Sequence, residues 1–461
     1  MSQSSLTQLV DYALAQRYEE LDARTVNALK TFIQDSLGVG ICGARVPFAQ
    51  KLKGLCKSWG QGQDAQVFNT GEWMTAPSAA MINAWQIHNQ EFDCVHEAAV
   101  VHPMAVIQAV LLAFSQRRGN ITGQQFITAV SVAVDVATTI GSATRSPLTF
   151  FRPAWCGALG AVCGMAWLDG LSNEQTQQAL GITYSMLGGT MQAHVEGTSM
   201  LAMQIGVAAR SAINAYDLAA AGLDGPVDIL DGPFGFFSLI ERESDFPAAM
   251  QELLSEHRIN QVSHKPFPTG RACHGGLDAL QVLISQYGVK ASDIDKVTLF
   301  APPLINRLIG RRPTPEMAVS YARLCFAYSA ATLFIDGDVA VDCYDEHKLR
   351  NPERLALAEK FVVVLDDNTD PNAMSPQRIE VVLNDDRVLQ HDIPNTLGSP
   401  ARPLSREQHL NKFIRCCKAA PQPLNNSQIQ QLIETTDALD TLNNIDLLLP
   451  LSVPGDSPEE Q

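Results

Sequence analysis

Apolar residues recur at helical spacing through most of the first 260 residues of the chain. Such spacing places apolar side chains along one face of an α-helix. Alternating runs typical of strands are almost absent before His264. The pattern therefore predicts an all-α region with helices at Ser5–Ala15, Ala23–Ser36, Ala76–Ile87, Met104–Ser115, Thr122–Thr144, Ser172–Gly189 and Gln204–Gly222.

The pattern changes after His264. Helices are still expected at Ala272–Tyr287 and Met317–Ile335, but alternating segments now lie between turns rich in Asn and Asp. These segments predict strands at Lys296–Phe300, Phe361–Leu365, Arg378–Leu383 and Val388–His391. Helical spacing then returns at Arg406–Cys417, Ser427–Glu434 and Ile445–Leu449.

The order of these elements predicts two domains, as does the length of 461 residues. The fold class is mainly α with an α+β domain. We expect a large all-helical domain formed by residues 1–263 and 402–461, because the C-terminal helices resemble the first part of the chain. Residues 264–401 are expected to form a smaller α+β domain.

Composition and charge narrow the possible partners. The net charge of −16 argues against a nucleic-acid partner and against an anionic membrane surface. The longest uncharged apolar run, residues 98–116, is interrupted by His102 and Pro103, so it predicts a buried helix and no membrane span. The ten cysteines form no CxxC pair and no secretory signal is evident, which favours reduced thiols in the cytoplasm.

Ionisable residues are concentrated between two of the predicted helices. The segment from Asn83 to Ala113 contains His88, Glu91, Asp93, His96, Glu97 and His102. Burying so many such groups between apolar segments is costly unless they face a cleft and have partners. Pro103 suits the first turn of a helix, which places His102 at a helix N-terminus, where anions are favoured. The segment therefore predicts an active-site loop for a small carboxylate.

Two other interpretations of this segment are a metal site and a structural polar cluster at a domain boundary. The run HEAAVVH separates its histidines by six residues, whereas HExxH zinc sites place them four apart on one helix face. This spacing therefore argues against a metal, and a hydrogen-bonded acid–base loop is favoured over the structural cluster.

Further candidate residues lie outside this segment. Residues 263–280 combine Lys265, Arg271 and His274 before a helix, a grouping that suits a carboxylate, although a solvated hinge with incidental charges would look similar. His194 stands in a glycine-rich break, where a histidine serves as a base or as a loop stabiliser. Arg152 lies among aromatic residues and needs a carboxylate partner from the core or from a substrate.

Together these segments resemble the MmgE/PrpD family, which includes 2-methylcitrate dehydratase, cis-aconitate decarboxylase and iminodisuccinate epimerase. The similarity covers nearly the whole chain and rests on four segments in the family's order. They are NAWQIHNQEFDCVHEAAVVHP (with His88, Asp93, His102 and Pro103), GALGAVCGMAWLDGLSNEQTQQALGI, HKPFPTGRACHGGLDAL (with Lys265, His274 and Asp278) and ARLCFAYSAATLFIDGDV (with Arg323 and Tyr328).

The resemblance implies a helical domain, a smaller α+β lid domain, a site between them, a homodimer, and no metal or organic cofactor. Members of the family act on small di- and tricarboxylates. On this basis we expect catalytic roles for Asp93, His102, His194 and Lys265, and substrate contacts from His96, Arg152, Arg271, His274 and Tyr328.

The chain also departs from the family pattern. Arg152 stands where related dehydratases and decarboxylases carry a histidine. Leu201 and Gln204 replace the lysine and histidine of a K-x-[LF]-H-x-G segment, and Gly270 replaces a further histidine. These changes indicate a shorter or differently charged acid, or a different outcome after proton removal.

The sequence thus predicts a cofactor-independent lyase that removes a proton beside a carboxylate of a small di- or tricarboxylate. His102 or His194 is expected to act as the base and Asp93 to orient or tune a histidine. Lys265 is a candidate base or, with Arg152 and the helix terminus at His102, a stabiliser of the resulting charge. The alternatives are an epimerase of a similar acid and a carboxylate-binding homologue without activity.

Overall fold

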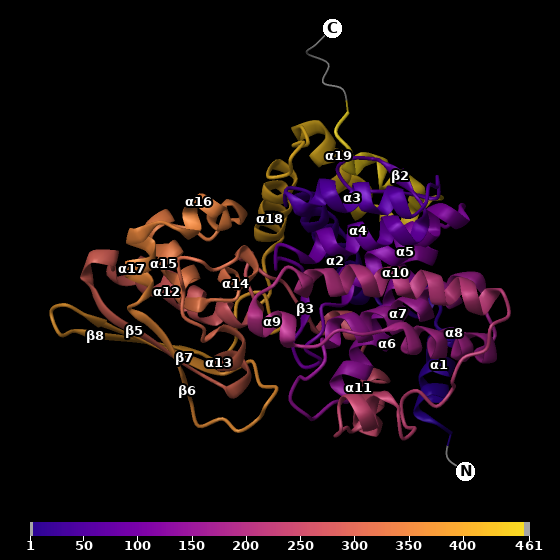
Figure 1. Cartoon of the computed structure of the whole chain (residues 1–461), viewed down its shortest axis with the longest axis horizontal. Helices are drawn as coiled ribbons and strands as arrows, with labels where there is room; N and C mark the ends of the chain where they lie inside the picture. The colour runs from indigo at the N-terminus through magenta and orange to yellow at the C-terminus, as the bar shows by residue number, and fades with distance from the viewer. Residues whose placement is uncertain (1–2, 456–461) are drawn as a thin grey trace, which may run out of the picture.

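The computed structural model describes residues 3–455, in which a large helical body stands beside a smaller α+β domain (Figure 1). This confirms the predicted fold class. The residues of the predicted domains that fall at 1–2 and 456–461 lie outside the described range. The body contains α1 (Ser5–Ala15), α2 (Ala23–Gly43), α3 (Phe48–Trp59), α4 (Ala76–His88), α5 (Pro103–Arg118), α6 (Gly123–Ser142), α7 (Arg152–Asp169), α8 (Asn173–Met186), α9 (Gln192–Glu196), α10 (Met200–Ala220), α11 (Phe246–Leu253), α18 (Arg406–Lys418) and α19 (Asn426–Asp437).

The body is organised around long, almost fully buried helices. α5 and α7 are buried along nearly their whole length, and α6 packs closely against α7. Gly160 of α7 allows this approach, because a Cβ there would meet the backbone carbonyl of Ala133 at 2.2 Å. The glycines of α7 thus allow neighbouring helices to pack closely against it. α6 is long and apolar enough to cross a membrane by composition, but 94% of its apolar window is buried inside the fold.

The α+β domain is built on a four-stranded sheet. Its strands are β5 (Ile294–Ala301), β6 (Phe361–Leu365), β7 (Gln377–Leu383) and β8 (Val388–Ile393), in the order β6-β5-β7-β8. β5 pairs parallel with β6 and antiparallel with β7, and α12 and α15 pack against the sheet. The domain's helices are α12 (His274–Tyr287), α13 (Pro303–Ile309), α14 (Val319–Ala322), α15 (Phe326–Asp336), α16 (Glu346–Leu349) and α17 (Pro352–Ala358).

Two large hydrophobic cores divide most of the described chain, and a third, small cluster (Val39, Cys42, Phe92, Val341 and Cys416) lies apart from them. The larger core draws on residues 6–262 and 413–449, together with Leu304 and Leu324, while the smaller one draws on residues 267–393. Leu308 and Met374 pack against both cores. α18 and α19 contact α2 of the helical body.

A few predicted elements differ in the structure. The predicted helix Met317–Ile335 is interrupted at Arg323–Cys325 and forms α14 and α15. Ile445–Leu449 is a short 3-10 turn at Ile445–Leu447, and the glycine-rich break before α10 contains α9. Two small sheets in the body were not predicted: β1 (Ala65–Gln66) with β2 (Trp73–Met74), and β3 (Val95–His96) with β4 (Val262–Ser263). Two-residue strands carry too little alternation to be detected from sequence.

Candidate active site

The small β3–β4 sheet brings the ionisable loop to the domain junction. Val95 pairs with Ser263 and His96 pairs with Val262. This pairing joins the loop after α4 to the segment that enters the α+β domain, so Lys265 reaches across to the loop. The Lys265 Nζ lies 2.9 Å from Glu91 Oε2 and 3.9 Å from Asp93 Oδ1. Glu91 and Lys265, which are 174 positions apart in the chain, therefore belong to one buried cluster.

Asp93 is the centre of this cluster. His88 Nδ1 lies 3.0 Å from Asp93 Oδ2, and His102 Nδ1 lies 3.3 Å from the same oxygen. The two imidazole rings meet edge to face with their centroids 4.9 Å apart. His88 is the last residue of α4, while His102 is the N-cap of α5 and makes no side-chain capping bond. We call His88, Asp93, His102 and Lys265 the cavity cluster.

The two histidines of the cavity cluster have opposite pKa shifts. Burial opposes protonation of both rings. For His88 the carboxylates of Asp93 and Glu91 outweigh burial and raise its pKa above the usual value. For His102 burial dominates, Lys265 and His88 add to it, and the pKa is lowered despite Asp93. One carboxylate is thus shared between a histidine that favours the charged form and one that favours the neutral form.

The carboxylates of the loop are held as anions. Burial alone would raise the pKa of Glu91, but Lys265 and the two histidines lower it to about 2. Burial likewise opposes ionisation of Asp93, yet His88 and His102 hold its pKa well below the usual value. The backbone at Glu91 is in the left-handed region with φ 50°, which directs this side chain back to Lys265. A non-glycine residue in that region costs on the order of 1–3 kcal/mol, and such strain often accompanies functional sites.

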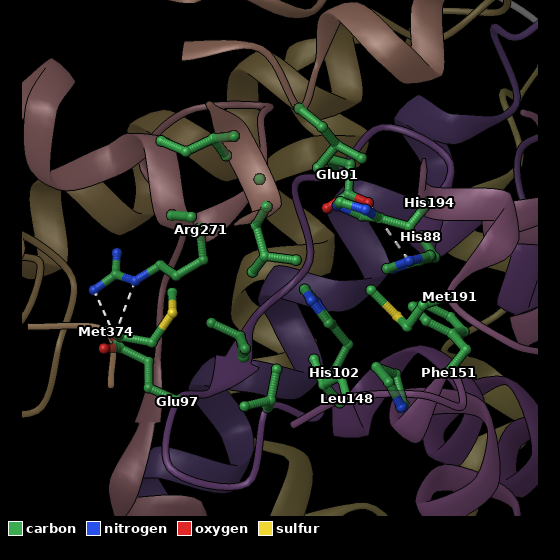
Figure 2. Close-up of a pocket in the computed structure, with 18 residues that line it drawn as sticks. His88, Glu91, Glu97, His102, Leu148, Phe151, Met191, His194, Arg271 and Met374 are labelled. Atoms are coloured by element: carbon green, nitrogen blue, oxygen red, sulfur yellow. Dashed lines mark hydrogen bonds and ion pairs between the residues drawn. The ribbon is translucent and has the colours of Figure 1, made fainter. Parts of the chain in front are cut away.

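A cavity opens beside this cluster between the two domains. The space between its lining side chains and at its open mouth amounts to about 640 Å³, part of which is open solvent. Residues from the helical body and from the α+β domain line it, and Figure 2 shows the cluster histidines and Glu91 on one side of it, with Arg271 and Glu97 on the other. The polar lining residues are His88, Glu91, Glu97, His102, His194 and Arg271.

Of the residues with predicted catalytic roles, His102 and His194 line the cavity, while Asp93 and Lys265 are fully buried behind them. His194 comes from α9 and contacts Arg311, whose Nη2 donates to the His194 carbonyl at 3.0 Å. Burial and Arg311 lower the pKa of His194 to about 4, so the ring is neutral near pH 7. The structure therefore places His102 and His194 at the cavity, with Asp93 in contact with His102 and Lys265 in contact with Glu91.

The predicted substrate-contacting residues are placed differently. Arg271 lines the cavity, but its guanidinium contacts Glu97 and the carbonyls of His264, Leu397 and Thr396. Arg152 is fully buried away from the cavity, where Glu241 binds it at 2.9 and 3.0 Å. The internal carboxylate that the sequence left open as its partner is therefore Glu241.

His96, His274 and Tyr328 also lie outside the cavity lining. His96 accepts from the Ala99 amide and faces Gln261, and its pKa is lowered to about 4, chiefly by burial. His274 Nε2 donates to the Thr269 carbonyl at 3.1 Å, and Tyr328 donates to the Cys343 carbonyl at 2.8 Å. Each of these three side chains is thus engaged by the protein's own groups, and Tyr328 lies in the core of the α+β domain.

Two residues of the site were not predicted to act in it. His88 was noted in the loop and in the family motif, but its ring orientation towards Asp93 depends on how α4 ends. Glu91 and Lys265 are 174 positions apart, so only the β3–β4 pairing reveals them as an ion pair. For His88, the available signal was its match to the family motif. For the ion pair between Glu91 and Lys265, the sequence held no signal.

Within residues 3–455, two groups of side chains have the composition of a metal site. His88, Asp93 and His102 each offer a ligand atom within 4.8 Å of the others, and so do Asp35, His264 and His409. In the first group both Nδ1 atoms face one carboxylate oxygen, and His88 Nδ1 forms a hydrogen bond with it. In the second, Lys412 already binds Asp35 at 2.8 Å. The expectation that the protein uses no metal stays a prediction.

Comparison with known proteins agrees with the resemblance seen in the motifs. Residues 7–249 match the model of the MmgE/PrpD N-terminal domain, and residues 267–438 match that of the MmgE/PrpD C-terminal domain. This chain belongs to the MmgE/PrpD family. The C-terminal family model runs past the sheet into α18 and α19, which pack on the helical body.

Several characterised MmgE/PrpD proteins resemble the chain over almost its full length. Cis-aconitate decarboxylase of Homo sapiens is 26% identical over 95% of this chain and 92% of its own length. The Mus musculus enzyme of that name is 26% identical over 92% and 88%. Cis-aconitate decarboxylase of Aspergillus terreus is 24% identical over 94% and 92%. These relatives support a lyase of the MmgE/PrpD type.

Proposed function

We propose that this protein is a lyase that removes a proton from the carbon beside a carboxylate of a small organic acid and then releases water or carbon dioxide. The observation that carries the proposal is the pair of oppositely shifted histidines on Asp93 at the cavity wall. Groups whose environments separate their pKa values are suited to acid and base roles in one reaction.

His102 is the proposed base. Its lowered pKa favours the neutral ring, and the contact of Nδ1 with Asp93 leaves Nε2 as the nitrogen that accepts the proton. Asp93 then stabilises the imidazolium that forms. His194, which also lines the cavity and is also neutral, is the alternative base named by the sequence.

His88 is the proposed acid. Its raised pKa favours the protonated ring, and Asp93 holds Nδ1 so that Nε2 carries a proton to donate. In a dehydration, the carbon–hydrogen electron pair forms the double bond, and the departing hydroxyl takes the His88 proton and leaves as water. In a decarboxylation, the proton taken by His102 is returned to a neighbouring carbon, so that the double bond shifts. The carbon–carbon bond to a carboxylate then breaks, its electron pair stays on the substrate as carbon dioxide leaves, and protonated His88 donates a proton to that carbon. The charged His88 also stabilises negative charge developing on the substrate carboxylate.

Lys265 acts through the loop. Its side chain is fully buried and its Nζ contacts both the carboxylate and the carbonyl of Glu91. It therefore fixes the loop that carries Asp93 and lowers the pKa of His102. The homodimer and the cytoplasmic location implied by the resemblance and by the reduced thiols remain part of the proposal.

The test is a panel of small carboxylic acids followed by proton NMR in deuterium oxide. We expect deuterium incorporation beside a carboxylate together with release of water or carbon dioxide, and loss of both in His102→Asn. His347→Asn, which alters an exposed histidine of α16, is the matched control and keeps full activity. Deuterium incorporation without product release would indicate the epimerase. An acid that raises the Tm and is never consumed or exchanged would indicate a binding protein.

A further inference from the structure

The cavity wall between the two polar ends is apolar, which bears on the kind of acid that binds. Twelve of the 18 lining residues carry no polar or charged side chain. Leu148, Phe151 and Met191 come from the helical body, and Leu308 and Ile309 come from α13 of the α+β domain. In Figure 2, Leu148, Phe151 and Met191 lie beside His102, and Met374 lies beside the Arg271–Glu97 pair. A small polyanion has no apolar part to place against these side chains, so they would stay in contact with water.

The charges that line the cavity do not suit a polyanion either. Glu91 and Glu97 both line it, and Arg271 is its one permanent cation among the described residues. The Arg271 guanidinium is already engaged by Glu97 and three backbone carbonyls. The Lys265 ammonium is fully buried against Glu91. Each carboxylate of a ligand beyond the one at the histidines would therefore approach fixed negative charge with little to pair with it.

The backbone at Val100 gives a third and independent observation. Val100 lines the cavity with φ 52°, a left-handed conformation that β-branched residues rarely adopt. Glycine or asparagine would relax this position, since either occupies the region more easily. The chain instead places a branched apolar side chain in the wall at a strained position. Strain retained at a cavity points to a role in binding.

We infer that the substrate is a carboxylic acid with at most two carboxylates and an aliphatic arm. One carboxylate would lie at His88 and His102, and the arm would lie along the wall formed by Leu308, Ile309, Leu324 and Met374. This inference rests on the proposed function for its chemistry, since it takes the histidine end of the cavity as the reacting end. It separates this protein from an enzyme that prefers a tricarboxylate such as cis-aconitate.

The test compares two ligand series by calorimetry on the full chain. The first is malate and 2-alkylmalates with arms of one to five carbons, and the second is citrate and cis-aconitate. We expect Kd to fall about threefold to fourfold for each of the first added methylenes, the factor for burying one methylene group. We expect both tricarboxylates to bind at least tenfold more weakly than the best alkylmalate. Equal or tighter tricarboxylate binding, or no dependence on arm length, would overturn the inference.

A charge substitution in the wall provides the second measurement. Met374 is half-buried in a loop and packs against both cores, so Met374→Arg places a second cation in the cavity wall at some cost in stability. We expect it to weaken the longest alkylmalate at least tenfold and to strengthen cis-aconitate. Val364→Arg, on the exposed part of β6, is the matched control and changes neither. An unchanged preference in Met374→Arg contradicts the inference, and the wild-type series decides alone if that variant does not fold.

Turnover in the same samples separates the two proposals. If alkylmalates bind with the expected dependence on arm length but never exchange or eliminate, the proposed function fails and the ligand class stands. If tricarboxylates bind best and are converted, the ligand class fails and the proposed function stands.

Discussion

The cavity cluster has a counterpart made of the same side chains. His88, Asp93, His102 and Lys265 line or support the cavity, while Asp35, His264, His409 and Lys412 form a second buried group between α2, α18 and the segment that precedes Lys265. We call the second group the sealed cluster. Each cluster has one aspartate, two histidines and one lysine, yet their histidines behave differently.

The difference lies in where each lysine places its charge. Lys412 binds both oxygens of Asp35, at 2.8 and 3.0 Å, and also the carbonyl of Phe92. Lys265 binds Glu91 and stays 3.9 Å from Asp93. The negative charge of Asp35 is thus balanced by its ion pair with Lys412, whereas the negative charge of Asp93 acts mainly on its two histidines. Burial, only partly opposed by Asp35, lowers the pKa of His264 to about 3 and that of His409 to about 4.

The comparison teaches that residue type alone does not make an acid–base site. Nearby carboxylates raise the pKa of a histidine, and this outweighs burial for His88, which has both Asp93 and Glu91 beside it. It does not outweigh burial for His264 or His409, whose one carboxylate, Asp35, is paired with Lys412. Contact with the cavity then gives the cavity cluster access to a ligand. The sealed cluster thus has the residue types of an acid–base site, but both of its histidines have the lowered pKa values that burial produces.

The largest expected difference between the two clusters is the effect on turnover of removing one histidine from each. His102→Asn should lower turnover by about 10²–10⁴-fold, the usual range for a general base. His409→Asn should leave turnover within about threefold, because His409 does not touch the cavity. Steady-state rates of both folded variants with the best acid of the panel provide the check. Equal losses in both would show that the two clusters do not differ in function.

Removing the lysines should separate stability from activity. Lys412→Met leaves Asp35 buried without its cation, which typically costs about 3–5 kcal/mol. Urea unfolding measures this loss, and the double variant Lys412→Met/Asp35→Asn should recover part of it, because no charge is then left unpaired. Lys265→Met should lower turnover. Its loss of stability should be smaller than that of Lys412→Met, since Glu91 keeps a contact with His88 at 3.7 Å. A larger stability loss in Lys265→Met than in Lys412→Met would contradict the assignment of charge.

The pH dependence of activity sharpens the comparison further. The base His102 must be neutral, and its lowered pKa places the acid limb of kcat/KM below about 6.5. The acid His88 must be protonated, and its raised pKa places the alkaline limb above about 6.5. His88→Asn should remove the alkaline limb and lower the plateau about tenfold to a hundredfold. Survival of that limb in the variant would assign it to another group.

The smallest expected effect is on stability as a function of pH. His264 and His409 have lowered pKa values in the folded state, so the unfolded chain binds protons first. Their contribution is full above about pH 6.5 and is lost as the pH falls towards 4, by up to about 1.4 kcal/mol per pH unit for each. His409→Asn should therefore flatten the decline of urea stability between pH 6.5 and 5. An unchanged slope would mean that His409 is protonated in the folded protein.

The helical architecture was largely predictable, because helix signals are local. Ser5–Ala15 was predicted at the bounds observed, and Thr122 and Ser172 form the N-terminal capping boxes that their neighbours suggest. The composition change near His264 marked the start of the smaller core. The break at Arg323–Cys325 was missed, because the Arg323 guanidinium binds the carbonyls of Gln90 and Pro268 from distant segments.

Most residues of the candidate site could be singled out from the sequence, but the contacts between their side chains could not. The density of ionisable groups from His88 to His102 identified the loop, and Pro103 identified the helix that begins after it. Sequence could not show that Arg152 faces Glu241 or that Arg271 is bound by Glu97. These pairings join segments that are about 90 and 170 positions apart, and only the packed fold decides which carboxylate reaches which cation.

The most direct test is an NMR titration of ring-labelled histidines, assigned with His88→Asn, His102→Asn, His264→Asn and His409→Asn. We predict that His88 titrates above 6.5, that His102 titrates below 6.5, and that His264 and His409 stay neutral until the protein approaches acid unfolding. If His88 and His102 titrate on the same side of 6.5, or if the sealed cluster titrates like the cavity cluster, Asp93 does not divide an acid from a base and the account is contradicted.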